Sequence, residues 1–177
     1  QIPESLIETG GLKIYTTLDR EAQASLENSV KKEMINSGNI EVAGMMMNPK
    51  NGAVLAIVGG KDYSISQFNR AINSKRQVGS TMKPFLYYAA LENGFTPTTT
   101  FTSEKTVFTF SENKTYSPSN YGNIYADKPI TMAAAIAYSD NIYAVKTHLF
   151  LGEETLVDMA KRVGIDSELE AIPSLAL

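Results

Sequence analysis

The sequence contains no cysteine and only one histidine, His148. The absence of cysteine excludes a disulfide framework and any thiolate metal site. A single histidine also excludes a metal site built from several imidazoles. We therefore expect neither a metal ion nor another cofactor, and we assign no role to His148.

Long apolar runs and clusters of one charge are absent as well. The apolar runs at 53–58 and 132–138 are far shorter than the roughly 20 residues that a membrane-spanning helix needs. The net charge is only -3, with both signs interspersed, which argues against nucleic acid as a partner. The chain starts at Gln1 and shows neither a signal peptide nor an anchor, so we interpret it as a piece of a longer protein.

Periodicity and turn residues predict a chain of mixed helices and strands. We expect a strand over 12–18, a helix capped by Asp19, and two apolar strands at 41–47 and 53–58 that are covered on both faces. The three methionines of the first apolar strand, Met45–Met47, are expected to fill a core. Loops with short strands should follow over 96–128, and then three helices, which start after Thr131, near Ile142 and at Glu153.

The most hydrophobic helix of the chain is predicted over 79–92. Its residues from Phe85 to Leu91 leave almost no polar face, so it should lie in the interior. Pro84 lacks an N–H group and is tolerated only in the first turn of a helix. This places Ser80 at the start of the helix.

Ser80 and Lys83 form the pair that carries a specific chemistry. A serine hydroxyl needs an adjacent base to become a nucleophile, and with one histidine a Ser-His-Asp triad has little support. Residues three apart lie on one helix face, so the Lys83 amine can reach the Ser80 hydroxyl. Burial lowers the pKa of a lysine and lets the neutral amine accept a proton.

The Ser-x-x-Lys spacing alone is weak evidence. Ser29 with Lys32 and Ser111 with Lys114 have the same spacing, but the first pair lies on a solvated helix and the second in a polar loop region. Ser80 alone opens a buried helix. The predicted position at the start of a buried helix therefore identifies Ser80 as the candidate nucleophile.

A second polar element, Ser139-Asp140-Asn141, interrupts two apolar helical segments. It can project Ser139 and Asn141 into a cleft from rigid supports. Alternatively, Ser139 and Asp140 merely cap the helix that starts near Ile142. Together with Ser80 and Lys83, we favour the catalytic interpretation.

These two elements resemble the first two of the three motifs of penicillin-recognising serine enzymes. The flanking segments 11–19, 48–52, 68–71 and 116–121 narrow the resemblance to the transpeptidase domain of class A, bifunctional penicillin-binding proteins. The resemblance implies an α+β fold, a helical cluster plus an antiparallel sheet. It divides the chain into a linker strand and first helix at 1–39 and the N-terminal part of the transpeptidase domain at 40–177.

The resemblance also implies roles for the residues. Ser80 would attack the D-Ala-D-Ala bond of a peptidoglycan stem peptide, Lys83 would be the base, Ser139 a proton relay and Asn141 a ligand of the substrate amide. A second stem peptide would accept the acyl group, and β-lactam antibiotics would acylate the same serine. A family member acts on the extracytoplasmic face of the bacterial membrane.

The third family motif, Lys-Thr/Ser-Gly, occurs nowhere in the sequence. In the family it lies on a strand beside the serine and supplies an oxyanion donor. We therefore expect the sheet to be incomplete and the chain alone to be inactive, unless a second chain carries the missing C-terminal half.

Three alternatives remain open at this point. A β-lactamase would need a deacylating glutamate with a nearby asparagine after the second motif, and no asparagine follows Asn141. A D,D-carboxypeptidase shares the acyl-enzyme, and these motifs do not separate it from a transpeptidase. A non-catalytic binding or scaffold domain would not need both Ser80 and Lys83.

Overall fold

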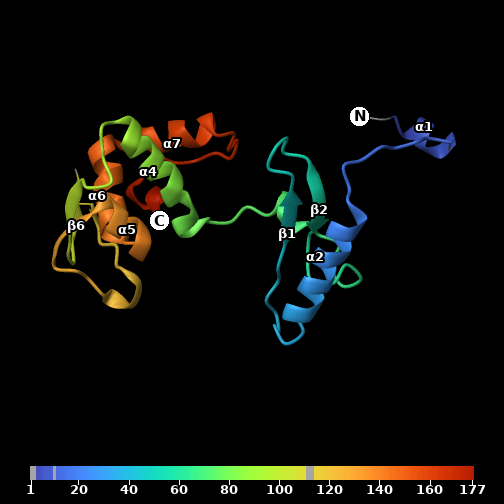
Figure 1. Ribbon diagram of the computed structural model, residues 1–177, viewed down its shortest axis with the longest axis horizontal. Coiled ribbons are helices and arrows are strands. Elements are labelled where there is room, and N and C mark those ends of the chain that lie inside the picture. The colour runs from blue at the N-terminus through green and yellow to red at the C-terminus, as the bar shows by residue number, and fades with distance from the viewer. Residues whose placement is uncertain (1–2, 10, 111–113) are drawn as a thin grey trace. The chain divides into compact units, whose positions relative to one another are not determined.

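The computed structural model describes residues 3–9, 11–110 and 114–177 and forms two compact units, Gln1–Arg76 and Gln77–Leu177. Figure 1 shows the N-terminal unit in blue and teal and the C-terminal unit from green to red. The described residues contain three two-stranded antiparallel sheets, each with helices in the same unit, as the predicted α+β class requires. Within the described residues, no helix is long and apolar enough to cross a membrane.

The N-terminal unit is built from α2 and a two-stranded sheet. Its elements are α1 (Glu4–Thr9), α2 (Arg20–Glu33), β1 (Gly44–Met47), β2 (Val54–Val58) and α3 (Arg70–Asn73). Asp19 caps α2 as predicted, because its carboxylate accepts hydrogen bonds from the N–H groups of Glu21 and Ala22. The helix packs beside the β1–β2 pair (Figure 1) and buries Val30.

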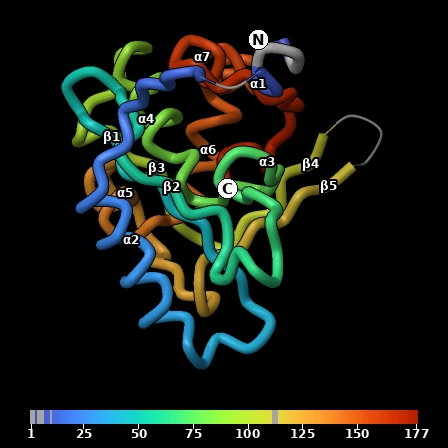
Figure 2. The backbone as a smooth tube through the Cα atoms, turned by 90° about the vertical axis from the view of Figure 1, so that its right-hand side faces the viewer, coloured from blue at the N-terminus to red at the C-terminus, as the bar shows by residue number. Residues whose placement is uncertain are grey.

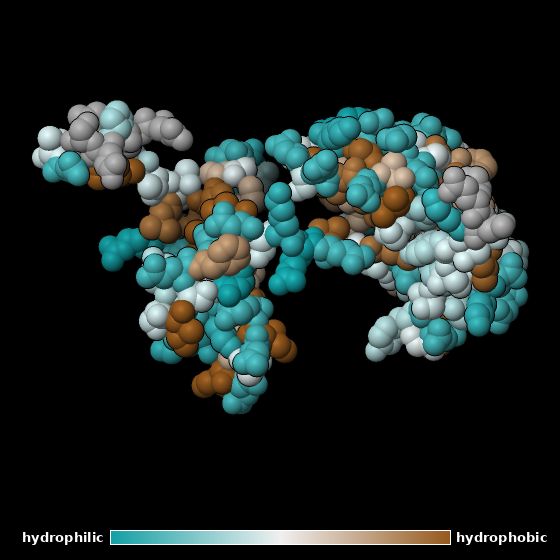
Figure 3. Space-filling view, turned by 180° about the vertical axis from the view of Figure 1, so that it is seen from behind, coloured by the Kyte–Doolittle hydropathy of each residue, from teal (hydrophilic) through white to brown (hydrophobic). Residues whose placement is uncertain are grey.

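Three predictions for this unit are wrong: the strand over 12–18, the core role of the methionines, and the covering of both faces of the sheet. Residues 12–18 form no strand, although Thr17 Oγ1 and the Asp19 N–H donate to the backbone of β2. The methionines of β1 do not fill a core, since Met45, Met46 and Met47 are 40–52% exposed. In this unit α2 covers the two-stranded sheet, and apolar side chains reach the surface (Figure 3).

The C-terminal unit packs against one face of α4, which buries Leu86 and Ala90 but leaves Tyr88 and Leu91 about half exposed, so the helix is not interior on all sides as predicted. Its helices are η1 (Gly79–Met82, a 3-10 helix), α4 (Lys83–Glu92), η3 (Tyr121–Asn123, also 3-10), α5 (Met132–Tyr138), α6 (Asn141–Leu151), α7 (Glu153–Arg162) and η4 (Pro173–Ala176, 3-10). Its strands are β3 (Thr100–Ser103), β4 (Phe108–Thr109), β5 (Thr115–Tyr116) and β6 (Lys128–Thr131). β3 pairs with β6, and β4 pairs with β5 as a hairpin (Figure 2).

The core of this unit joins α4, α6 and α7. Leu86, Tyr143 and Leu156, one from each helix, are fully buried in a single apolar cluster. α4 and α6 therefore have little polar surface, as their sequences predict, and Pro84 lies in the first turn of α4. Thr131 caps α5 as predicted, by accepting a hydrogen bond from the Ala134 N–H.

Candidate active site

The first site element is the turn that carries Ser80 into α4. Gly79 has a positive φ of 61°, a conformation that glycine adopts without a steric penalty, and the following residues wind into η1. Ser80 is exposed, whereas Lys83 at the start of α4 is only 4% exposed. The chain therefore presents the hydroxyl to solvent and draws the amine into the unit.

The second site element is the turn between α5 and α6. Ser139 ends α5 in the left-handed conformation, with φ 52° and ψ 44°. Asp140 is the N-cap of α6, and its Oδ1 accepts a 2.7 Å hydrogen bond from the Tyr143 N–H. The helix-cap interpretation therefore holds for Asp140 but not for Ser139, which ends α5, and the two neighbours of Asp140 face Lys83. The catalytic interpretation stays a prediction.

Lys83 joins the two elements through three hydrogen bonds. Its Nζ donates to the Ser139 carbonyl at 2.7 Å, to Ser139 Oγ at 3.1 Å and to Asn141 Oδ1 at 2.6 Å. An ammonium group has three donors and no acceptor, so this arrangement suits the protonated lysine in full. Lys83, Ser139 and Asn141 are therefore brought together as predicted.

Ser80 is next to this cluster in sequence but is not bonded to it. Among the described residues no hydrogen bond joins Ser80 Oγ to Lys83 Nζ, in contrast to the predicted pair. Lys83 Nζ does not bond Ser80 because its three N–H groups are directed to Ser139 and Asn141 in the second turn. A protonated amine also has no lone pair with which to accept the serine proton.

Burial lowers the pKa of Lys83 to about 8, and the nearby Asp140 carboxylate opposes this shift by favouring the ammonium form. Burial dominates because the side chain leaves water almost completely. Asp140 is itself buried, and its Oδ2 accepts hydrogen bonds from Ser103 Oγ and from Asn120 Nδ2. The lysine can therefore lose its proton far more easily than a lysine in water.

Sequence reasoning missed the polar groups behind the second turn. The sequence marks Asp140 only as a possible cap and Asn120 only as part of the 116–121 segment, and it gives no sign of Ser103. These three side chains meet at one carboxylate oxygen, Asp140 Oδ2. The repeated Asn and Ser around 116–121 are the one sequence signal that could have indicated them.

The other Ser-x-x-Lys pairs do not form comparable sites. Ser29 is exposed on α2 and donates to the Ser25 carbonyl, while Lys32 pairs with the adjacent Glu33. Ser111 lies outside the described residues. Within the described part of the chain, no group of three or more His, Asp or Glu side chains could hold a metal ion.

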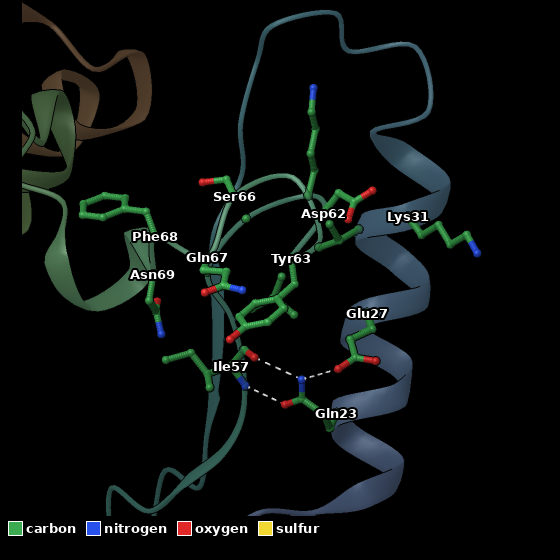
Figure 4. A pocket seen from close by; sticks show the side chains of 15 residues that line it. Gln23, Glu27, Lys31, Ile57, Asp62, Tyr63, Ser66, Gln67, Phe68 and Asn69 are labelled. Carbon is green, nitrogen blue, oxygen red and sulfur yellow. Dashed lines mark hydrogen bonds between the residues drawn. The ribbon is translucent and has the colours of Figure 1, made fainter.

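A separate cavity of about 600 Å³ opens in the N-terminal unit, between α2 and the segment that follows β2 (Figure 4). In the wall of this cavity, the Gln23 side-chain amide forms hydrogen bonds with both the N–H and the carbonyl of Ile57. None of the four predicted site residues lines it. Its position therefore adds nothing to the cluster around Lys83.

The fold agrees with the comparison to known proteins. Residues 42–171 match the family model of the penicillin binding protein transpeptidase domain. This match covers well over half of the chain, which therefore belongs to the penicillin-binding protein transpeptidase family.

Particular relatives support this membership. The chain is 53% identical over 173 residues to Penicillin-binding protein 2D of Bacillus subtilis (strain 168), covering 97% of this chain and 25% of that protein. The crystal structure of Penicillin-Binding Protein 1A from Haemophilus influenzae matches with a TM-score of 0.72 and 33% identity, over 77% of this chain and 21% of that one. An imipenem acyl-enzyme complex of penicillin-binding protein A from M. tuberculosis shares the fold, with a TM-score of 0.71 and 22% identity, over 86% of this chain and 40% of that one. The chain thus spans about a quarter of the length of its Bacillus relative.

Proposed function

We propose that this chain provides the nucleophile and the base of a peptidoglycan D,D-transpeptidase. The observation that carries the proposal is the buried Lys83, held between the Ser80 turn and the Ser139–Asn141 turn. A lysine with a pKa near 8 is neutral often enough at physiological pH to act as a base.

Deprotonation of Lys83 changes what the cluster can do. The neutral amine keeps two N–H donors and gains a lone pair, so one of the three present hydrogen bonds is given up. The lone pair can then accept the Ser80 proton while Ser80 Oγ forms a bond to the carbonyl carbon of a D-Ala-D-Ala peptide. The bond from that carbon to the nitrogen of the last D-Ala breaks, Ser139 gives its hydroxyl proton to the departing amine, and the Lys83 ammonium returns to Ser139 the proton taken from Ser80.

Asn141 and the start of η1 supply the remaining contacts. A primary amide has two N–H groups, so Asn141 can donate one to Ser119, as it does at 2.7 Å, and offer the other to a substrate amide. The Ser80 N–H belongs to a helix start, where backbone donors lack intrahelical partners, and we assign it to the oxyanion.

The third motif, Lys-Thr/Ser-Gly, must come from outside these 177 residues. Loss of one oxyanion donor typically lowers kcat by about 100- to 1000-fold, so we expect this chain alone to be barely acylated. We expect the natural protein that contains this sequence, in its longest form, to act on the extracytoplasmic face of the membrane. Its partners there would be peptidoglycan stem peptides and β-lactam antibiotics.

The test is covalent labelling of that polypeptide with a fluorescent penicillin, followed by intact-mass measurement. We expect a mass increase of one penicillin in the wild type and in Ser29→Ala, and none in Ser80→Ala. Labelling that survives Ser80→Ala would refute the assignment. Rapid release of hydrolysed penicillin would instead indicate a β-lactamase, and product analysis with a D-amino acid acceptor separates transpeptidase from carboxypeptidase.

A further inference from the structure

The side chain of Asn120 holds the turn that carries Ser139 and Asn141. Its Oδ1 accepts hydrogen bonds from the backbone N–H of Asn141 at 2.7 Å and of Ile142 at 3.3 Å. Its Nδ2 donates to Asp140 Oδ2 at 2.7 Å and to the Ile124 carbonyl at 3.1 Å. One amide thus binds three consecutive residues of the turn from a loop about 20 residues away.

Ser119, the residue before Asn120, orients the side chain of Asn141. The Ser119 carbonyl accepts a 2.7 Å hydrogen bond from Asn141 Nδ2, which leaves Asn141 Oδ1 to face Lys83 Nζ at 2.6 Å. If the Asn141 amide rotated by half a turn, an N–H group would face the ammonium and the Ser119 carbonyl would face an oxygen. The 119–120 segment therefore sets which end of the Asn141 amide meets the lysine.

We propose that Asn120 is a positioning residue for the Lys83 cluster and acts through Asn141. This inference rests on the proposed acylation chemistry, because it concerns how Lys83 is held for it. Asn120 touches neither Ser80 nor Lys83, so its effect is on geometry. A misplacement of about 1 Å in such a cluster can lower the rate about 100-fold.

Ser103 provides a matched control for a merely structural role. It is fully buried, and its hydroxyl donates to Asp140 Oδ2, the same oxygen that Asn120 Nδ2 contacts. It makes no hydrogen bond to the backbone of Asn141 or Ile142. Ser103 Oγ also accepts a long, 3.4 Å hydrogen bond from Asn120 Nδ2, but Asn120 has its own bonds to Asp140, Asn141 and Ile142. Ser103→Ala therefore weakens the buried carboxylate cluster and leaves the bonds of Asn120 to the turn in place, whereas Asn120→Ala removes those bonds as well.

The experiment compares Asn120→Ala and Ser103→Ala with Ser117→Ala. Ser117 is an exposed residue of the same loop whose hydroxyl donates a long, 3.5 Å hydrogen bond to the Thr106 carbonyl. The longest natural polypeptide containing the sequence is mixed with nitrocefin, a chromogenic β-lactam, and the acylation rate constant is separated from the dissociation constant of the initial complex. Melting temperature is measured for each variant. Hydrogen–deuterium exchange is followed at the Asn141 and Ile142 amides.

For Asn120→Ala we expect an acylation rate constant lowered about 10- to 100-fold, a nearly unchanged dissociation constant, and faster exchange at both amides. Ser103→Ala should lower the melting temperature comparably, with slow exchange at those amides and a much smaller loss of rate. Ser117→Ala should match the wild type. Equal rate losses in Asn120→Ala and Ser103→Ala, or unchanged exchange in Asn120→Ala, would overturn the proposal.

The exchange measurement separates this proposal from the proposed function. If the wild type does not react with nitrocefin, the transpeptidase assignment fails and the positioning role fails with it. If it reacts while Asn120→Ala reacts equally fast, only the positioning role fails. Exchange at the two amides shows in either case whether Asn120 holds the turn.

Discussion

The acylation rate should rise with pH and reach half of its maximum near pH 8. Lys83 must be neutral to take the Ser80 proton, and burial lowers its pKa from 10.5 to about 8. The perturbation is therefore a change of pH from 6 to 9.5 under otherwise fixed conditions. The longest natural polypeptide that contains the sequence is the material to use.

The magnitude follows from the fraction of neutral amine. With a pKa of about 8, about one tenth of Lys83 is neutral at pH 7, whereas with a pKa of 10.5 the fraction is about 0.03%. The buried position thus increases the amount of available base about 300-fold at pH 7. Between pH 7 and pH 9 the rate should increase about tenfold and then level off, because the amine is then almost entirely neutral.

The assay is stopped-flow acylation by nitrocefin at saturating concentration, with a Ser80→Ala blank for spontaneous hydrolysis at high pH. Lys83→Arg is the control for a base that cannot become neutral, and it should be slower by about 100-fold or more. A midpoint near 10.5, a flat profile, or a rate that falls as pH rises would refute the reasoning that Lys83 is the base.

Three further predictions concern stability. Between about pH 8 and pH 10.5 Lys83 binds more protons in the unfolded chain than in the folded chain. The free energy of unfolding, measured by urea denaturation, should therefore rise by about 3 kcal/mol across this window in the wild type relative to Lys83→Met. His148 is fully buried, and burial lowers its pKa below the ordinary 6.5. Its contribution to the free energy of unfolding should therefore be fully present above pH 6.5 and decrease as the pH falls below that value. A His148→Gln variant should not show this decrease. Tyr87→Phe should leave stability unchanged or raise it, because its buried hydroxyl has no partner among the described residues. Tyr143→Phe should cost about 1–3 kcal/mol in the same urea denaturation experiments, because it leaves the Thr99 carbonyl without its donor. Equal costs for the two tyrosines would contradict the hydrogen-bond assignment.

Local patterns were sufficient to predict the elements that hold the site. The apolar run correctly predicted that α4 joins the core, although its Tyr88 and Leu91 are exposed, Pro84 fixed where it starts, and Thr131 marked the start of α5. These features depend on residues within one or two helical turns, which is the range over which periodicity and capping act. Because Ser139 and Asn141 follow directly on such an element, their placement could be predicted as well.

Contacts between distant segments could not be predicted in the same way. The strand expected over 12–18 had the right composition, but only Thr17 Oγ1 and the Asp19 N–H bond to β2, so no ladder forms. Asn120 and Ser103 lie 20 and 37 residues from Asp140, in segments whose polar composition indicates only loops and short strands. Sequence periodicity does not predict which of the many asparagines and serines forms a hydrogen bond with a given carboxylate.

Ser139 shows why the site favours chemistry over stability. A residue other than glycine in the left-handed region costs about 1–2 kcal/mol, and Ser139 adopts it at φ 52°. This conformation directs both the carbonyl and the hydroxyl of Ser139 to Lys83 Nζ. Glycine would relieve the strain but remove the hydroxyl, and so the proton relay that we propose. The strained turn, the buried amine and the buried Asp140 are each unfavourable alone. Lys83 bonds Ser139 and Asn141, while Asp140 is held by Ser103, Asn120 and the Tyr143 N–H, and these bonds allow all three to persist in a single fold.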